Sequence, residues 1–194
     1  MATKYQTREE WLQHAAFYCR AHFQAAGIDC PEVNVSVGFP GGGSARTRIG
    51  ECWSGRAAAD GMAAVFISPT LSDAGKVLGV LVHELVHAAV GTEHGHKAPF
   101  KQAAVAVGLC GKMTATDETP ELQATFAQWM VVLGDYPHAA LGLSDRKKQT
   151  TRLIKCECTE CGYTVRTTAK WLEVGAPLCP CNREPMKAHG DDGE

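Results

Sequence analysis

Two histidines and a glutamate lie close together in an otherwise apolar stretch of the chain. The segment VLGVLVHELVHAAV contains the pattern HExxH, formed by His83, Glu84 and His87. On a helix, residues four positions apart share one face, so the two imidazoles can bind one zinc ion. Glu84 stands beside them and can accept a proton from a water molecule that the metal activates. The pattern therefore predicts a metal-dependent hydrolase with Glu84 as its general base.

A catalytic zinc ion needs a third protein ligand and one open coordination position. Two further histidines, His94 and His96, follow in TEHGHKAPF, just after Gly91, where the helix is expected to end. A chain that turns back at Gly91 can present either imidazole to the metal, and Glu93 is a weaker candidate. The pattern alone leaves the third ligand open.

The nine cysteines are unevenly distributed, and five of them crowd into the last part of the chain. Cys158-x2-Cys161 is a good zinc knuckle, and Cys179-x-Cys181 follows seventeen residues later. Two facing knuckles make a zinc ribbon, so these four thiols predict a structural zinc site. The spacing of the second pair is unusually short, and Cys156 is a spare thiol that can replace Cys181.

The elements that position these ligands follow from capping signals and periodicity. A capping box formed by Thr7 and Glu10 marks a helix start, and Pro120 after Thr119 marks another. The apolar segment 72–90 is too long for a strand and predicts a buried helix. Helices are predicted over 7–27, 72–90, 99–107 and 119–134, and short strands over 33–37, 48–53 and 62–68. We therefore expect an α+β fold with a small, largely antiparallel sheet.

Length and composition indicate one main domain and one small module. The 194 residues are 45% apolar and 21% charged, which is ordinary for a soluble globular protein. We expect a catalytic domain over 1–145 and a zinc ribbon, with a basic linker and an acidic tail, over 146–194. The start MATKYQTREEW lacks the apolar core of a secretory signal, and no apolar run reaches the roughly 20 residues that span a bilayer. We therefore expect a cytoplasmic protein without a membrane partner.

The charge of the chain is concentrated in its last part. The net charge is -2 overall, yet residues 146–188 carry nine Lys/Arg and four Asp/Glu. Such a basic module can attract an anionic partner such as DNA, although solvated lysines on a soluble ribbon give the same balance. Aromatic residues there are few, only Tyr163 and Trp171, so the sequence shows no obvious stacking platform for single strands.

The stretch HELVHAAVGTEHGHKAPF resembles the SprT-like zinc metallopeptidases. In that family the HExxH helix is followed, after a variable loop, by a Gly-His pair and by an aromatic residue four positions beyond it. Gly95-His96 and Phe100 match this arrangement. The resemblance covers roughly residues 7–134 and extends to the cysteine module, because SprT-like proteins commonly end in a zinc ribbon.

The resemblance implies a site and a fold. His83, His87 and His96 would bind the catalytic zinc ion, with His94 as the alternative third ligand, and Glu84 would be the general base. The implied fold is a zincin-like metallopeptidase domain with HExxH on a buried helix, followed by a ribbon that holds a second, structural zinc ion.

The leading hypothesis is a zinc-dependent endopeptidase. The resemblance implies that its substrates are proteins bound or crosslinked to DNA, and thus a role in DNA repair, with the ribbon recruiting nucleic acid. The alternative is a non-catalytic nucleic-acid-binding or transcription-associated zinc protein, and a third option is a zinc hydrolase with other substrates. Glu84 argues against a structural HExxH site, which would not need that carboxylate. Tyr136 and His138, which follow the last predicted helix of the main domain, are candidates for stabilising an oxyanion.

Overall fold

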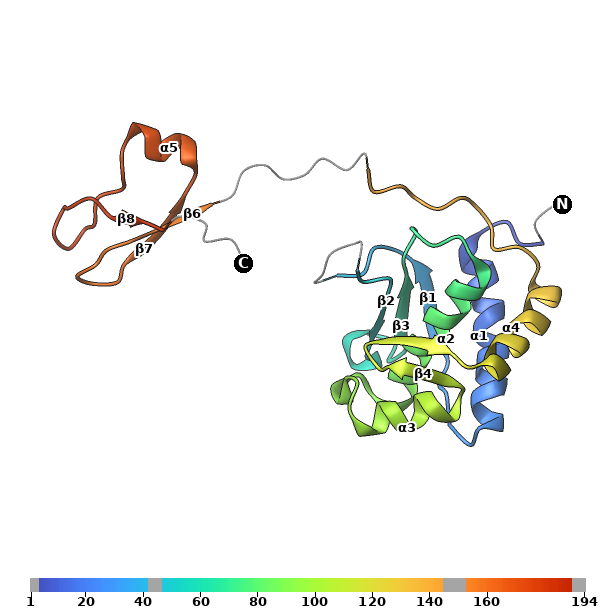
Figure 1. The fold of residues 1–194 in the computed structure, drawn as a ribbon. Helices are drawn as coiled ribbons and strands as arrows, with labels where there is room; N and C mark the ends of the chain where they lie inside the picture. The colour runs from blue at the N-terminus through green and yellow to red at the C-terminus, as the bar shows by residue number, and fades with distance from the viewer. Residues whose placement is uncertain (1–3, 42–46, 145–152, 190–194) are drawn as a thin grey trace. The chain divides into compact units, whose positions relative to one another are not determined.

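A computed structural model describes residues 4–41, 47–144 and 153–189 (Figure 1). The chain divides into two compact units, Met1–Ser144 and Asp145–Glu194. Among the described residues, none of the helices has the length and hydropathy of a membrane-spanning segment. The elements of unit 1 are α1 (Arg8–Ala25), β1 (Val33–Val37), β2 (Gly50–Trp53), η1 (Gly55–Ala57), β3 (Ala63–Ile67), α2 (Ala74–Val90), η2 (Thr92–His94), α3 (Ala98–Ala106), β4 (Leu109–Lys112), β5 (Ala115–Glu118) and α4 (Pro120–Leu133).

Unit 1 is built on a three-stranded sheet with the order β1-β3-β2. The outer strand β2 pairs antiparallel with β3, whereas β1 pairs parallel with β3. The expectation of a largely antiparallel sheet is therefore wrong, and the sheet is mixed. The reason is that β3 runs antiparallel to β2 and lies between β2 and β1, where its direction matches that of β1. Alternation in the sequence identifies strands but does not give their order.

The helices α1 and α2 pack on one face of this sheet, as Figure 1 shows. On that face, Val65 and Ile67 of β3 are fully buried together with Trp11 of α1 and Leu81 of α2. The confirmed helix α2 is apolar nearly all round because it lies between the sheet and the helices α3 and α4. The core therefore fixes α2, the element that carries the HExxH pattern.

The ends of the helices follow the predicted signals. The capping box is confirmed, because the Thr7 side chain accepts from Glu10 N and the Glu10 side chain caps the start of α1. Helix α4 begins as predicted, with Thr119 accepting from Leu122 N. The hairpin β4–β5 was not predicted, and its antiparallel strands form a second small sheet beside α2.

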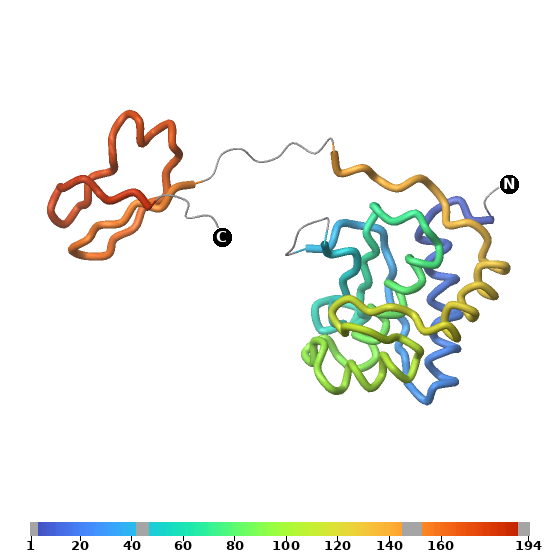
Figure 2. The backbone as a smooth tube through the Cα atoms, viewed as in Figure 1, coloured from blue at the N-terminus to red at the C-terminus, as the bar shows by residue number. Residues whose placement is uncertain are grey.

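The segment that leaves α4 runs back past the start of α1, where one buried arginine holds it (Figure 2). Arg8 is only 5% exposed, and its guanidinium donates to the carbonyl oxygens of Pro69, Pro137, His138 and Ala139 at 2.9–3.2 Å. The same guanidinium lies 4.8 Å from the centroid of the Tyr136 ring. Arg8 thus closes unit 1 by joining α1, the residues after β3 and the residues after α4.

Unit 2 contains a three-stranded antiparallel sheet and a short helix. Its elements are β6 (Ile154–Glu157), β7 (Thr164–Thr167), α5 (Ala169–Val174) and β8 (Lys187–Ala188), and the strand order is β7-β6-β8. Its buried side chains are Cys156, Cys158, Cys179 and Met186. A core this small cannot stabilise a fold of this size by apolar burial alone. The predicted basic linker and acidic tail fall largely on residues 145–152 and 190–194, outside the described residues.

We predict that Arg8→Met lowers the free energy of unfolding of unit 1 by about 3 kcal/mol. Methionine fills similar volume but leaves four carbonyl oxygens without their donor, and buried unpaired polar groups are costly. Urea denaturation followed by near-ultraviolet circular dichroism measures the change.

Arg56→Met is the matched control for this change. Arg56 is exposed in η1, so the same substitution there should alter stability by no more than about 0.5 kcal/mol. Equal effects of the two substitutions would show that the Arg8 hydrogen bonds do not stabilise the closed arrangement.

Candidate metal centres

Three imidazoles converge at the C-terminal half of α2. The Nε2 atom of His96 lies 3.2 Å from the Nε2 atoms of both His83 and His87. His83 and His87 come from successive turns of α2, and His96 comes from the loop between η2 and α3. His94 lies in η2 and does not belong to this group of ligand atoms. The structure thus brings together the three histidines that the resemblance implied.

The spacing of these nitrogens fits one metal ion. Zinc binds imidazole nitrogen at about 2.0–2.1 Å, so neighbouring ligands of a tetrahedral ion lie roughly 3.4 Å apart. The two separations of 3.2 Å agree with this value. Three histidines would leave a fourth position open, which is the arrangement of catalytic rather than structural zinc sites. The donor set is compatible with zinc but does not by itself identify the metal.

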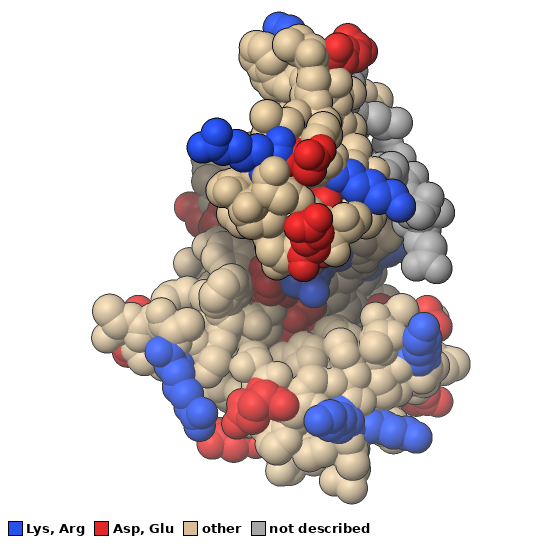
Figure 3. All heavy atoms as spheres, turned by 90° about the vertical axis from the view of Figure 1, so that its left-hand side faces the viewer, with Lys and Arg blue, Asp and Glu red and all other residues tan. Residues whose placement is uncertain are grey.

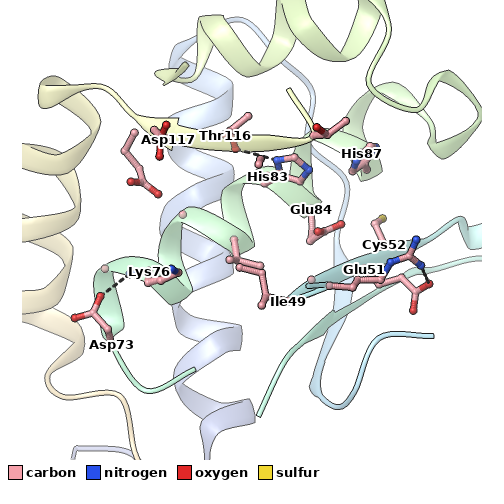
Figure 4. A pocket seen from close by; sticks show the side chains of 18 of the residues that line it. Ile49, Glu51, Cys52, Asp73, Lys76, His83, Glu84, His87, Thr116 and Asp117 are labelled. Carbon is pink, nitrogen blue, oxygen red and sulfur yellow. Dashed lines mark hydrogen bonds and ion pairs between the residues drawn. The ribbon is translucent and has the colours of Figure 1, made fainter. Parts of the chain in front are cut away.

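Neighbouring residues fix the orientation of the imidazoles. Nδ1 of His83 lies 3.0 Å from Oγ1 of Thr116, on β5, as the dashed line in Figure 4 marks. When Nε2 binds a metal, Nδ1–H donates to this hydroxyl and holds the ring in place. The centroid of the buried Phe100 ring lies 4.4–4.9 Å from the centroids of all three imidazoles, so this ring packs against each of them.

Burial and crowding keep the imidazoles uncharged. Loss of solvent contact, followed by the effects of His87 and His96, lowers the pKa of His83 to about 3. Burial and the neighbouring His96 likewise lower the pKa of His87 to about 4, and burial lowers that of His96. A neutral imidazole is the form that offers a lone pair to a metal, so the site is prepared for binding near neutral pH.

The carboxylate of Glu84 lies beside the histidines and points toward β2 (Figure 4). Its side chain is buried, and this burial, aided by Glu51 and opposed by Arg48, raises its pKa to about 8. A cation held by the three imidazoles would favour the ionised form that can accept a proton. A Cβ atom on Gly50 would lie only 2.5 Å from Glu84 Oε1, so β2 passes directly over this carboxylate.

These groups open into a groove of about 1080 Å³. One wall is β2 with the residues before it, the floor is α2, and the other wall is formed by β5 and α4. The groove is large enough for a peptide or a comparable ligand, because ligand sites usually span about 300–1,000 Å³. Its lining includes Arg48, Gly50, Cys52, Lys76, Gly79, His83, Glu84, His87, His96, Thr116, Glu118 and Met130.

Unit 2 gathers four thiols at its centre. The Sγ separations are 3.8 Å for Cys158–Cys181, 3.4 Å for Cys161–Cys179 and 3.3 Å for Cys179–Cys181. Tetrahedral zinc with bonds of about 2.3 Å places its sulfur ligands roughly 3.8 Å apart, so this set fits a closed four-thiolate site. Cys156 is buried in β6 but is not a member of the group, so the structure does not use it in place of Cys181.

The thiols differ in how readily they lose a proton. Backbone N–H groups of Cys161 and Glu160 lower the pKa of Cys158 to about 7. Hydrogen bonds with neighbouring thiols, that of Cys179 first, hold the pKa of Cys181 above its ordinary range. Binding of a cation would therefore release protons from this cluster, and its occupancy should couple to the folding of unit 2.

Two residues that the sequence suggested for the site lie elsewhere, and one residue of the site was not predicted. Tyr136 is buried beside Arg8 and Trp11, and neither it nor His138 lines the groove, so both are wrong as candidates for stabilising an oxyanion. Thr116 was missed because the turn of the β4–β5 hairpin, Met113-Thr114, lacks the Asn-Gly or Asp-Gly signal of tight hairpins. The alternation around Thr116 was the only available sign of its strand.

We predict that His96→Ala removes one of two zinc equivalents per chain, whereas His94→Ala retains both. Loss of a metal ligand leaves only two histidines to bind the ion. This should lower the zinc affinity by more than the 10- to about 100-fold that follows loss of a residue hydrogen-bonded to a ligand. Zinc content after dialysis against a chelator, measured by mass spectrometry, gives the stoichiometry. Retention of both equivalents by His96→Ala, with loss in His94→Ala, would move the third ligand to His94.

We also predict that Cys161→Ser removes the other zinc equivalent and the amide hydrogen-exchange protection of β6 and β7. The reason is that the described part of unit 2 has little apolar core, so a cation bound by the four thiols would stabilise its strands. Cys156→Ser is the matched control, because it changes a buried thiol of β6 outside the cluster and should retain both equivalents. Loss of zinc in Cys156→Ser, with the exchange protection of β7 retained, would show that Cys156 is a ligand.

Comparisons of the chain with protein-family models, with curated proteins and with solved structures each found no match. The residues that can carry chemistry form two groups. One is a three-histidine group with a buried carboxylate in an open groove of unit 1, and the other is a four-cysteine group in unit 2.

Proposed function

We propose that the protein is a zinc-dependent endopeptidase of the SprT-like kind, with a zincin-like unit 1. The observation that carries this proposal is the convergence of three imidazole nitrogens beside the Glu84 carboxylate, at the floor of an open groove. A purely structural site would need neither the open coordination position nor the carboxylate.

Each residue has a defined task in this mechanism. His83, His87 and His96 would hold the zinc ion, and Thr116 would keep the ring of His83 in its binding orientation. Bound zinc would polarise the peptide carbonyl and lower the pKa of a water molecule toward neutrality. Glu84 takes the proton of the attacking water and delivers it to the departing amine, so the carboxylate is unchanged after one cycle.

The edge of β2 supports binding of an extended peptide. The carbonyl of Ile49 accepts from Ser68 N at 2.9 Å, so Ile49 faces β3. Because antiparallel hydrogen bonds alternate, the backbone groups of Gly50 and Cys52 point to the free edge. A peptide that pairs with this edge would pass over Glu84, since Gly50 lies against that carboxylate.

Exposed aromatic residues in unit 2 support a contact with nucleic acid, and we propose DNA-bound proteins as substrates. Tyr163 and Trp171 are about half exposed, and Lys170 lies 5.2 Å from the Trp171 ring. Bases can stack on such side chains. On the face drawn in Figure 3, positive and negative side chains are interspersed between larger uncharged areas. The support from the described residues therefore comes from the aromatic residues more than from charge.

We predict that Glu84→Gln keeps both zinc equivalents but lowers peptide hydrolysis by about 10²–10⁴-fold. The amide has the same shape but cannot accept a proton at neutral pH. The assay incubates the zinc-loaded full-length protein with β-casein, and separately with a DNA-binding protein with and without DNA, and quantifies fragments on gels.

Glu93→Gln is the control for this variant, because Glu93 is an exposed carboxylate in η2 outside the group of ligand atoms. It should cleave like the unmodified protein. Full activity of Glu84→Gln would refute the assigned general base. No cleavage of any substrate by the zinc-loaded protein would favour the non-catalytic nucleic-acid-binding alternative.

A further inference from the structure

The outer face of the sheet in unit 1 carries a second pocket, of about 390 Å³. It lies on the face away from α1 and α2, because Trp53 pairs with Ala64 and Glu51 with Phe66, while Val65 between them is buried in the core. Aromatic and other apolar side chains form its lining, among them Phe39, Trp53, Met62 and Phe66. Single exposed apolar residues are ordinary, but several that line one concavity indicate a binding site.

The structure holds this pocket open. Phe39 precedes β2 and is 45% exposed. The segment that carries it is tied to the sheet on both sides, because Gly38 N donates to Ile67 O and Gly41 N donates to Glu51 Oε2. Arg48 adds hydrogen bonds to Gly41 O and Glu51 Oε1. The rim of the pocket is therefore fixed by hydrogen bonds of Gly38, Gly41, Arg48 and Glu51 rather than by collapse of its aromatic side chains.

The second pocket and the groove of the candidate metal site lie on opposite faces of β2. Glu51 lines both of them, and β2 lies between them as an outer strand of the sheet that the described residues form. Side chains of a strand alternate between the two faces of a sheet. In a peptide paired with β2, residues opposite Gly50 and Cys52 would face the groove, and a residue opposite Glu51 or Trp53 would face the second pocket.

We propose that this outer pocket is a specificity subsite that receives one large apolar side chain of the extended peptide substrate. The two chain neighbours of that residue face the metal groove. This inference rests on the proposed endopeptidase function and names the class of peptide that the enzyme prefers.

Charge supports an apolar occupant. Among the described residues of the lining, Glu51 alone is ionisable, and its carboxylate oxygens accept from Gly41 and Arg48. A charged or strongly polar side chain would lose its hydration there without gaining a partner. Phe, Leu or Met would instead bury apolar surface against Trp53 and Phe39, so the pocket selects by size and hydrophobicity.

The test measures peptide binding without cleavage, using full-length, zinc-loaded Glu84→Gln protein. The probes are two fluorescein-labelled nine-residue peptides of Thr and Ser, one with a single central Phe and the other with Ser there. Fluorescence anisotropy should show about tenfold or greater preference for the Phe peptide. Adding Trp53→Ala should reduce this preference to less than about threefold. Trp171→Ala changes another half-exposed tryptophan, in unit 2, and should leave the preference intact.

Three results overturn the subsite. The first is that the two peptides bind equally well, or that neither binds detectably. The second is a preference for the Phe peptide that persists in the Trp53→Ala variant. The third is a dimer of the unmodified protein, seen by sedimentation, that dissociates in the Trp53→Ala variant. The last would assign the pocket to a second copy of the chain. Cleavage of β-casein by the unmodified protein separates this inference from the proposed function. Cleavage without a binding preference for large apolar residues would refute only the subsite. A Trp53-dependent binding preference without cleavage would refute only the endopeptidase function.

Discussion

The arrangement of unit 1 depends on placing the polar side chains of the candidate site at the groove while α2, which carries most of them, stays packed in the core. Three side chains of α2 at the site, those of His83, Glu84 and His87, are interrupted by the fully buried Leu85 and Val86. An unpaired charge or polar group in the interior costs several kcal/mol. The rotation of α2 about its axis is therefore fixed, because turning it would bury the ligands and expose the leucines. The groove exists because this face of α2 has to stay open.

Two glycines allow the walls of the groove to approach α2 closely. A Cβ atom on Gly50 would collide with Glu84 and Val80, and one on Gly79 would collide with the carboxylate of Glu118. Both positions have ordinary backbone dihedral angles, so the requirement is for space rather than for conformational freedom. With these approaches, β2 and β5 reach the site from opposite sides. One presents a free edge to an incoming chain, and the other brings Thr116 to His83.

Local signals predicted the elements of the fold better than their assembly. The α+β class, the capping box at Thr7 and the long helix over HExxH follow from side-chain periodicity and capping, which act within a few residues, and the structure confirms them. The parallel pairing of β1 with β3 and the contact of Thr116 with His83 join residues about 30 positions apart, and no local signal encodes them. The outer pocket is likewise built by three separate segments that meet only in the fold. The zincin-like assignment of this α+β unit stays a prediction.

The two candidate sites differ in the way expected if one is used for chemistry and the other for stability. Four thiols surround the centre of unit 2, and four thiolates would complete the coordination of a tetrahedral divalent ion and outweigh its positive charge. Three uncharged imidazoles in unit 1 would leave both a position and the full positive charge available to a substrate. Unit 1 has an apolar core of its own and does not need a metal to bury its surface, whereas unit 2 has almost none. A cation bound in unit 2 would therefore stabilise the fold, whereas unit 1 can form its core without one and would hold a cation beside an open groove.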